Sequence, residues 1–126
     1  MIKLITLITL MIAVATLASG AIQMIKPSFV LSLVGGESTA TSNHFFAIIG
    51  MFMFLFGGMM IHALYNANEN KAAVLWSALQ KLGASLAVFI GIYLQLFAPI
   101  AGLVAGFDFI SFVLFLIYYR MIPRLN

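Results

Sequence analysis

Cysteine is absent from this chain of 126 residues, and charged side chains are scarce, with six basic and three acidic residues in total. Without cysteine, a disulfide framework, a thiolate nucleophile and a cysteine-ligated metal or iron–sulfur centre are excluded. The few basic residues are scattered, so they form no patch that would bind nucleic acid. Charged residues make up 7% of the chain, far below the roughly 25% of soluble domains, so water is not its main solvent.

Hydrophobic residues make up 64% of the chain, and its mean hydropathy is +1.18. Helices of this composition present apolar side chains on nearly every face, and lipid is the surrounding that accepts them. The hydrophobic runs lack the alternation of strands, and an open sheet in lipid would leave backbone groups unpaired. The sequence therefore predicts an all-α integral membrane four-helix bundle, with a single transmembrane domain over residues 1–126.

The first predicted span covers residues 4–25, between Lys3 and Lys26, and a proline then prevents the helix from continuing. A secretory signal would also begin with a basic residue and end with small residues such as those at 18–21. This apolar run is longer than the usual signal core, so we interpret it as a span. A short apolar piece follows at 27–34, which we expect to lie at the membrane interface before a polar loop.

Three further spans meet the requirement of about 20 mostly apolar residues. Ser42 or Asn43 can cap the start of the second span by accepting its first free backbone amides. A polar turn at 66–70 separates the second span from the third. The third and fourth spans are joined only by Ala98 and Pro99, so they are expected to form a close antiparallel hairpin. The predicted spans cover residues 45–65, 71–97 and 100–119.

The basic residues near the span ends predict the orientation, because positively charged loops resist translocation across the membrane. Lys3, Lys71, Arg120 and Arg124 fall on one side of the predicted bundle, and Lys26 stands alone on the other. The N-terminus and the C-terminus are therefore both predicted to be cytoplasmic.

Small residues recur at intervals of four in the last two spans. Helices in lipid associate closely where small residues let their backbones approach. We expect these two stripes to face each other, and either would also suit contact with a second copy of the chain. The predicted packing residues are Gly83, Ala87 and Gly91 in the third span, and Ala98, Gly102 and Gly106 beside or in the fourth.

Asp108 is predicted to lie close to the middle of the membrane, about 13 Å from the outer end of its span. A charge at that depth costs about 2.5 to 3.5 kcal/mol on insertion scales, so Asp108 marks a candidate polar site. Ser85 and Thr16 are expected at a similar depth, where they could hydrogen-bond the carboxyl group. Two interpretations stay open, a carboxyl that locks helices together and a site that responds to protons or cations.

Lys81 lies deep in the third span, and its long stem would let the ammonium group reach toward the cytoplasmic face. His62 is expected at a similar depth, where it could join Lys81, Gln80 and Ser77 in a polar cluster facing a cytoplasmic vestibule. A reaching lysine and an interfacial histidine without such a cluster are the simpler alternative. Counted along the predicted spans, Lys81 and Asp108 differ by about 10 Å in depth. We therefore expect no direct salt bridge between them, because contact would need one helix to slide or a water molecule to bridge the two groups.

The sequence carries no recognisable catalytic or metal-binding pattern. It has no nucleophile triad, no HExxH, no phosphate-binding glycine loop and no carboxylate cluster. Its histidines, His44 and His62, lie eighteen residues apart in one predicted helix, about 27 Å, so they cannot share a metal or a haem. No enzyme activity and no metal site are therefore predicted, and the pattern identifies no particular cofactor.

Three segments resemble small bacterial four-helix membrane proteins of the DoxX-like kind. They are NHFFAIIG at 43–50, WSALQKLGA at 76–84 and GFDF at 106–109. The resemblance implies the four-helix fold in a bacterial inner membrane, and it draws attention to Lys81 and Asp108. Some members of that family are associated with oxidoreductase systems, but the resemblance implies little about activity.

Three classes of function suit this pattern. An accessory or scaffold subunit needs only packed helices and a membrane protein partner, and the scarcity of chemistry favours it. An oligomeric transporter or channel for ions or small solutes would use Asp108 and Lys81 in a polar path. A binder of a lipid or a quinone-like molecule would use an aromatic lining. The residues expected to form that lining are Phe52, Phe54, Phe56 and Trp76. The expected partners are the lipid bilayer and either another membrane protein or a second copy of the chain.

Overall fold

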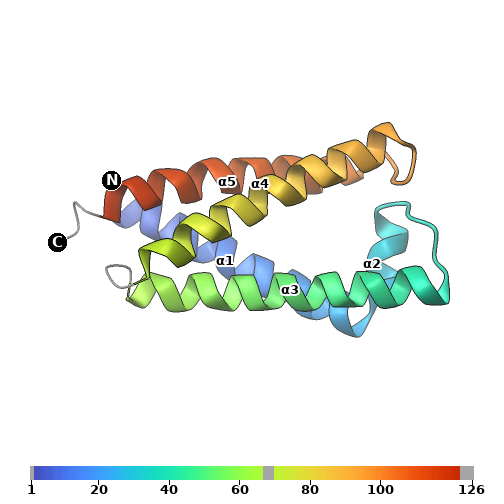
Figure 1. The fold of residues 1–126 in the computed structure, drawn as a ribbon, viewed down its shortest axis with the longest axis horizontal. Coiled ribbons are helices and arrows are strands. Elements are labelled where there is room, and N and C mark those ends of the chain that lie inside the picture. Colours follow the sequence, from blue (N-terminus) through green and yellow to red (C-terminus); the bar gives the residue numbers. More distant parts are fainter. Residues whose placement is uncertain (1, 67–69, 123–126) are drawn as a thin grey trace.

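The computed structural model describes residues 2–66 and 70–122, which form five helices and no strand (Figure 1). The all-α prediction is confirmed, and four of the helices are long and apolar enough to cross a membrane. Arg124 and the middle of the predicted turn at 66–70 lie outside the described residues. The helices are α1 (Ile2–Ile25), α2 (Pro27–Leu33), α3 (Ala40–Tyr65), α4 (Lys71–Tyr93) and α5 (Ala101–Met121).

The four long helices form two antiparallel pairs, with α1 along α3 and α4 along α5 (Figure 1). The pairs meet at the end where α1 begins and α5 ends, which we call the closed end. They diverge toward the end that carries α2, which we call the open end. At the closed end, the Lys71 ammonium group also lies 4.8 Å from the ring centre of Tyr119. An apolar core fills the closed end, formed by Ile12, Ala13, Met60, Ala63, Val74, Ala78, Phe115, Tyr118 and Ile122.

Glycines let α1 and α3 approach each other until their backbones touch. A Cβ atom built on Gly57 would lie 2.6 Å from the backbone nitrogen of Leu17, and one on Gly20 would lie 2.6 Å from the carbonyl oxygen of Gly50. These distances are too short for any side chain. The small-residue packing expected in lipid therefore occurs in this pair of helices.

The interface between α4 and α5 differs from the one predicted from their small residues. A Cβ atom on Gly83 or Gly106 would meet nothing within 4 Å, and Ala87 is exposed. Gly102 has only the end of Ile92 nearby, and Gly91 packs against the ring of Phe97. Most of the buried residues of the two helices instead follow one another at intervals of three or four. They are Val74, Ser77, Ala78, Lys81, Ser85 and Gly91 on α4, and Ala101, Ala105, Asp108, Ser111, Phe115 and Tyr118 on α5.

Two helix boundaries differ from the predicted spans. The helix α3 begins five residues early, because Thr39 and Ser42 form a capping box in which each side chain accepts a bond from the backbone amide of the other. The helix α4 ends at Tyr93 instead of residue 97. There Leu96 donates to the carbonyl of Gly91, and Gln95 takes a left-handed φ of 61°. This Schellman motif usually needs glycine, so the sequence carried no signal for it.

The diverging ends of the two helix pairs are joined by a contact between loops. The helix α2 ends in a second Schellman motif, with Gly35 at a φ of 75°. The amide of Ala98 donates to the carbonyl of Val34 over 2.8 Å, and Gly35 lies too close to Ala98 to carry a side chain. The predicted short piece at 27–34 is thus a helix held against the link between α4 and α5. We call this contact, between residues 34–36 and 97–98, the latch.

Gly57→Ala is expected to lower the stability of the fold, whereas Gly83→Ala is expected to raise it slightly. At Gly57 the added methyl group meets the backbone of α1, and such overpacking costs about 1 to 3 kcal/mol. At Gly83 the methyl group meets open space, and a helical alanine is about 0.5 to 1 kcal/mol more favourable than glycine. Thermal unfolding of both variants in one detergent measures the difference, and equal midpoints would contradict the observed α1–α3 contact.

Candidate functional site

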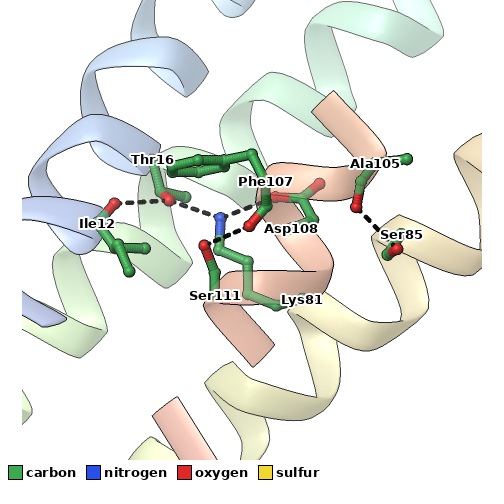
Figure 2. Close-up of polar contacts among 8 residues, drawn as sticks. All are labelled: Ile12, Thr16, Lys81, Ser85, Ala105, Phe107, Asp108 and Ser111. Carbon is green, nitrogen blue, oxygen red and sulfur yellow. Dashed lines mark hydrogen bonds and ion pairs between the residues drawn. The ribbon is translucent and has the colours of Figure 1, made fainter. Parts of the chain in front are cut away.

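Lys81 and Asp108 form an ion pair inside the helix bundle (Figure 2). The Lys81 Nζ atom lies 3.3 Å from Oδ1 of Asp108 and donates a hydrogen bond of 2.6 Å to Oγ1 of Thr16. Thr16 in turn donates to the carbonyl of Ile12 over 2.9 Å. Only 4% of the Lys81 side chain and 12% of the Asp108 side chain are exposed. Three helices, α1, α4 and α5, therefore meet at one buried ammonium group.

The expectation that Lys81 and Asp108 would not pair directly was wrong. The hydroxyl group of Ser85 donates to the carbonyl of Ala105 over 2.9 Å, which shows that these two residues are level in the antiparallel pair. One turn down α4, Lys81 is then level with Phe109 and adjacent to Asp108. The predicted spans had continued α4 to residue 97 and begun the next helix at 100. The level contact of Ser85 with Ala105 differs from that predicted register by about seven residues, or about 10 Å, and α4 itself ends four residues early.

The surroundings of Asp108 and Lys81 also differ from those that the sequence predicted. Thr16 and Ser85 both lie near Asp108 in depth, but Thr16 bonds Lys81 and the carbonyl of Ile12, and Ser85 bonds the carbonyl of Ala105. Lys81 does not reach toward the end of the bundle that was predicted to be cytoplasmic, because its ammonium group is held between α1 and α5.

His62 does not join Lys81 in a polar cluster. Its side chain is exposed on α3, whereas Lys81 is buried. Ser77 is buried, and its hydroxyl group has no hydrogen-bond partner among the described residues. Ser77, Gln80 and Lys81 do line one small pocket, but His62 is not among its lining residues.

A polar stripe along α1 is the signal that sequence reasoning missed. Thr9, Thr16 and Gln23 are buried and follow one another at intervals of seven residues. On α4, Ser77, Lys81 and Ser85 are buried in the same way. In a helix that is apolar all round, a polar side chain at regular spacing identifies the face turned toward the protein interior. This spacing would have placed Thr16 and Lys81 on facing sides.

The ion pair leaves no net charge in the interior, because one ammonium group faces one carboxylate. Lys81 also lies 5.5 Å from the ring centre of Phe107, a distance at which the face of the ring attracts a cation. Removing either charged partner would strand the other in a region of low dielectric constant, which is strongly destabilising. The pair is thus stable only as a unit.

A cavity of about 660 Å³ lies between the two helix pairs and ends at this ion pair. Its walls are mainly apolar, and Thr16, Lys81 and Asp108 border it. The helix α2 covers one end through Phe29, Val30, Leu33 and Val34. Pockets that hold small molecules have volumes of about 300 to 1,000 Å³, so this cavity has the size of a ligand site.

The aromatic residues of this cavity are not those that the sequence suggested. Trp76 and Phe52 are 62% and 52% exposed on the outer surface. Neither they nor Phe54 and Phe56 line the cavity. The aromatic side chains that do line it are Phe29, Phe46, Phe97 and Phe107.

Metal binding and similarity to known proteins give no further indication of what the site does. In the part of the chain that the structure describes, no group of three His, Asp or Glu side chains is placed to hold a metal ion. Comparison with family models, with curated proteins and with solved structures finds no significant match to this chain. The site is therefore interpreted from its own geometry.

Lys81→Met is expected to destabilise the protein by about 3 kcal/mol or more, because it leaves the carboxylate of Asp108 buried without a counter-charge. The double variant Lys81→Met/Asp108→Leu is expected to recover most of that loss, because it removes both charges. The midpoints of thermal unfolding for wild type, both single variants and the double variant give the coupling between the two residues. Additive losses would show that the two side chains do not interact. Ser85→Ala, which removes only one neighbouring hydrogen bond, serves as the control.

Proposed function

We propose that this protein binds a hydrophobic small molecule between its two helix pairs, within a membrane. The observation that carries the proposal is the cavity of about 660 Å³, whose walls are mainly apolar and whose inner end is a buried ion pair. Ligand sites commonly combine such apolar walls with a few polar groups that orient the ligand.

The outer surface supports a membrane location. Large apolar side chains are exposed along all four long helices, among them Met11, Phe45, Leu86 and Ile110. Polar side chains such as Thr9, Lys81 and Ser111 are buried instead. This distribution suits a lipid surrounding, in which apolar side chains face the hydrocarbon and polar ones face the protein interior. A bacterial inner membrane is the location that the DoxX-like resemblance implies, and we include it in the proposal.

The charges support an orientation with both chain ends in the cytoplasm. Lys3 and Arg120 lie near the start of α1 and the end of α5, at the closed end of the bundle, and Lys71 begins α4 at that end too (Figure 1). Lys26 follows α1 at the opposite end. We propose that the closed end is cytoplasmic, because the positive charges gather there.

Cysteine labelling can test this orientation without background, because the natural chain has no cysteine. Ala40 and Asn66 are both exposed, at opposite ends of α3. In intact cells, Ala40→Cys is expected to react with a membrane-impermeant maleimide, and Asn66→Cys is expected to react only after the membrane is opened. The reverse pattern would overturn the orientation, and equal labelling of both in intact cells would contradict membrane insertion.

The cavity favours ligand binding over the two other roles considered. A transport path along Asp108 and Lys81 would need a continuous series of polar groups, but the walls of the cavity that leads to the pair are mainly apolar. An accessory role needs only a partner-facing surface, and it leaves the cavity unexplained. The accessory subunit and the transporter remain alternatives that the following measurement distinguishes.

Native mass spectrometry of the protein, extracted gently from its own membrane, is expected to show a bound hydrophobic molecule. Ala84→Phe is expected to lower its occupancy about tenfold or more, because the added ring enters the cavity next to Lys81. Ala18→Phe adds the same ring on the exposed face of α1 and should leave occupancy unchanged. Equal occupancy in both variants would contradict binding in the cavity. A defined protein partner without a ligand would favour the accessory role, and a bare symmetric oligomer would favour the transporter.

A further inference from the structure

We infer that the ligand of this cavity is a neutral amphiphile with a hydroxyl group, and that the hydroxyl group binds at the Lys81–Asp108 pair. The inference rests on the proposed function and specifies the class of ligand. It follows from three properties of the cavity, which are its charge balance, the bonding groups that remain at its inner end, and the apolar character of its walls.

The charge balance disfavours a charged ligand. Lys81 and Asp108 are the charged side chains that line the cavity, and they neutralise each other over 3.3 Å. A carboxylate or an ammonium group on the ligand would enter a poorly hydrated space without a free counter-charge, or would have to break the existing pair. Either event is strongly unfavourable, because a buried charge is stable only when paired.

The bonding groups at the inner end suit a hydroxyl group. An ammonium group has three donors, and Lys81 uses two of them for Thr16 and Asp108. A carboxylate accepts at both oxygens, and Asp108 uses Oδ1 for Lys81. A hydroxyl group accepts and donates at once, so it can accept a bond from the third donor of Lys81 and donate one to the second oxygen of Asp108. A carbonyl group could only accept, so the second oxygen of the Asp108 carboxylate would remain without a donor.

The remaining walls suit one apolar body. From Asp108 to Ala101, both of which line the cavity, α5 rises by about 10 Å. The wall between these two residues includes Leu103, Val104 and Phe107, and α2 adds Leu33 and Val34 at the far end. Leu103 is also 76% exposed at the edge of the cavity, so a longer apolar tail can extend sideways toward the lipid.

The test compares four probes that share one chain, namely hexadecanol, hexadecane, hexadecanesulfonate and hexadecylamine. The wild-type protein in lipid nanodiscs is incubated with each probe, and native mass spectrometry reports the bound fraction. Hexadecanol is expected to bind at least about tenfold more tightly than the other three. Asp108→Asn leaves the ammonium group without its counter-charge, so its preference is expected to move to the sulfonate. Lys81→Met leaves the carboxylate, so its preference is expected to move to the amine.

Some outcomes separate the inference from the proposed function. If Ala84→Phe abolishes binding but the wild type holds hexadecane or a charged probe as tightly as hexadecanol, the cavity binds ligands and the inferred hydroxyl recognition is wrong. If no probe binds better to wild type than to Ala84→Phe, the proposed function itself fails. Where a single variant does not fold, Lys81→Met/Asp108→Leu replaces it. That double variant is expected to bind hexadecane and hexadecanol equally, and a retained preference for hexadecanol would overturn the inference.

Discussion

The pairing of one buried lysine with one buried aspartate is the constraint on which the rest of this structure depends. An isolated charge in an apolar interior is strongly unfavourable, so Lys81 and Asp108 must lie within reach of each other. Their contact requires a particular register between α4 and α5, in which Ser85 is level with Ala105. The bond from Lys81 to Thr16 then ties α1, which belongs to the other helix pair, to the same point.

The two ends of the bundle are held together by different interactions. At the closed end, α1, α3, α4 and α5 share an apolar core that includes Met60 and Phe115. At the open end, the two pairs are connected by the latch, where a single backbone hydrogen bond joins Ala98 to Val34. The cavity lies between these two attachments and ends at the ion pair. A chain of only 126 residues has room for this partly open cavity because its helix pairs diverge instead of packing along their whole length.

The distribution of polar groups also connects the fold to the proposed function. Hydroxyl groups of Thr16, Ser85 and Ser111 bond to carbonyl oxygens of helices, which removes their need for water. Gln23 reaches from α1 to the carbonyl of Phe46 and strengthens the α1–α3 pair beside the cavity. With these groups satisfied, the ion pair and the neighbouring Gln80, which also lines the cavity, retain bonding capacity for a ligand.

Hydropathy alone determined the number of long helices, their approximate bounds and the two ionisable residues that would matter. These are local properties, because about 20 apolar residues identify a span and a charge within it stands out. The tertiary structure decided which residues meet. The end of α4 depends on Gln95 adopting a left-handed conformation that its side chain does not predict. The register in which Ser85 is level with Ala105 differs by about 10 Å from that of two helices joined only at residues 98 and 99. Likewise, Gly57 packs tightly while Gly83 faces open space, although both are glycines within apolar helices. The spacing of small residues within one helix cannot reveal which of them a neighbouring helix covers, because that choice is made by the links and by contacts distant in the sequence.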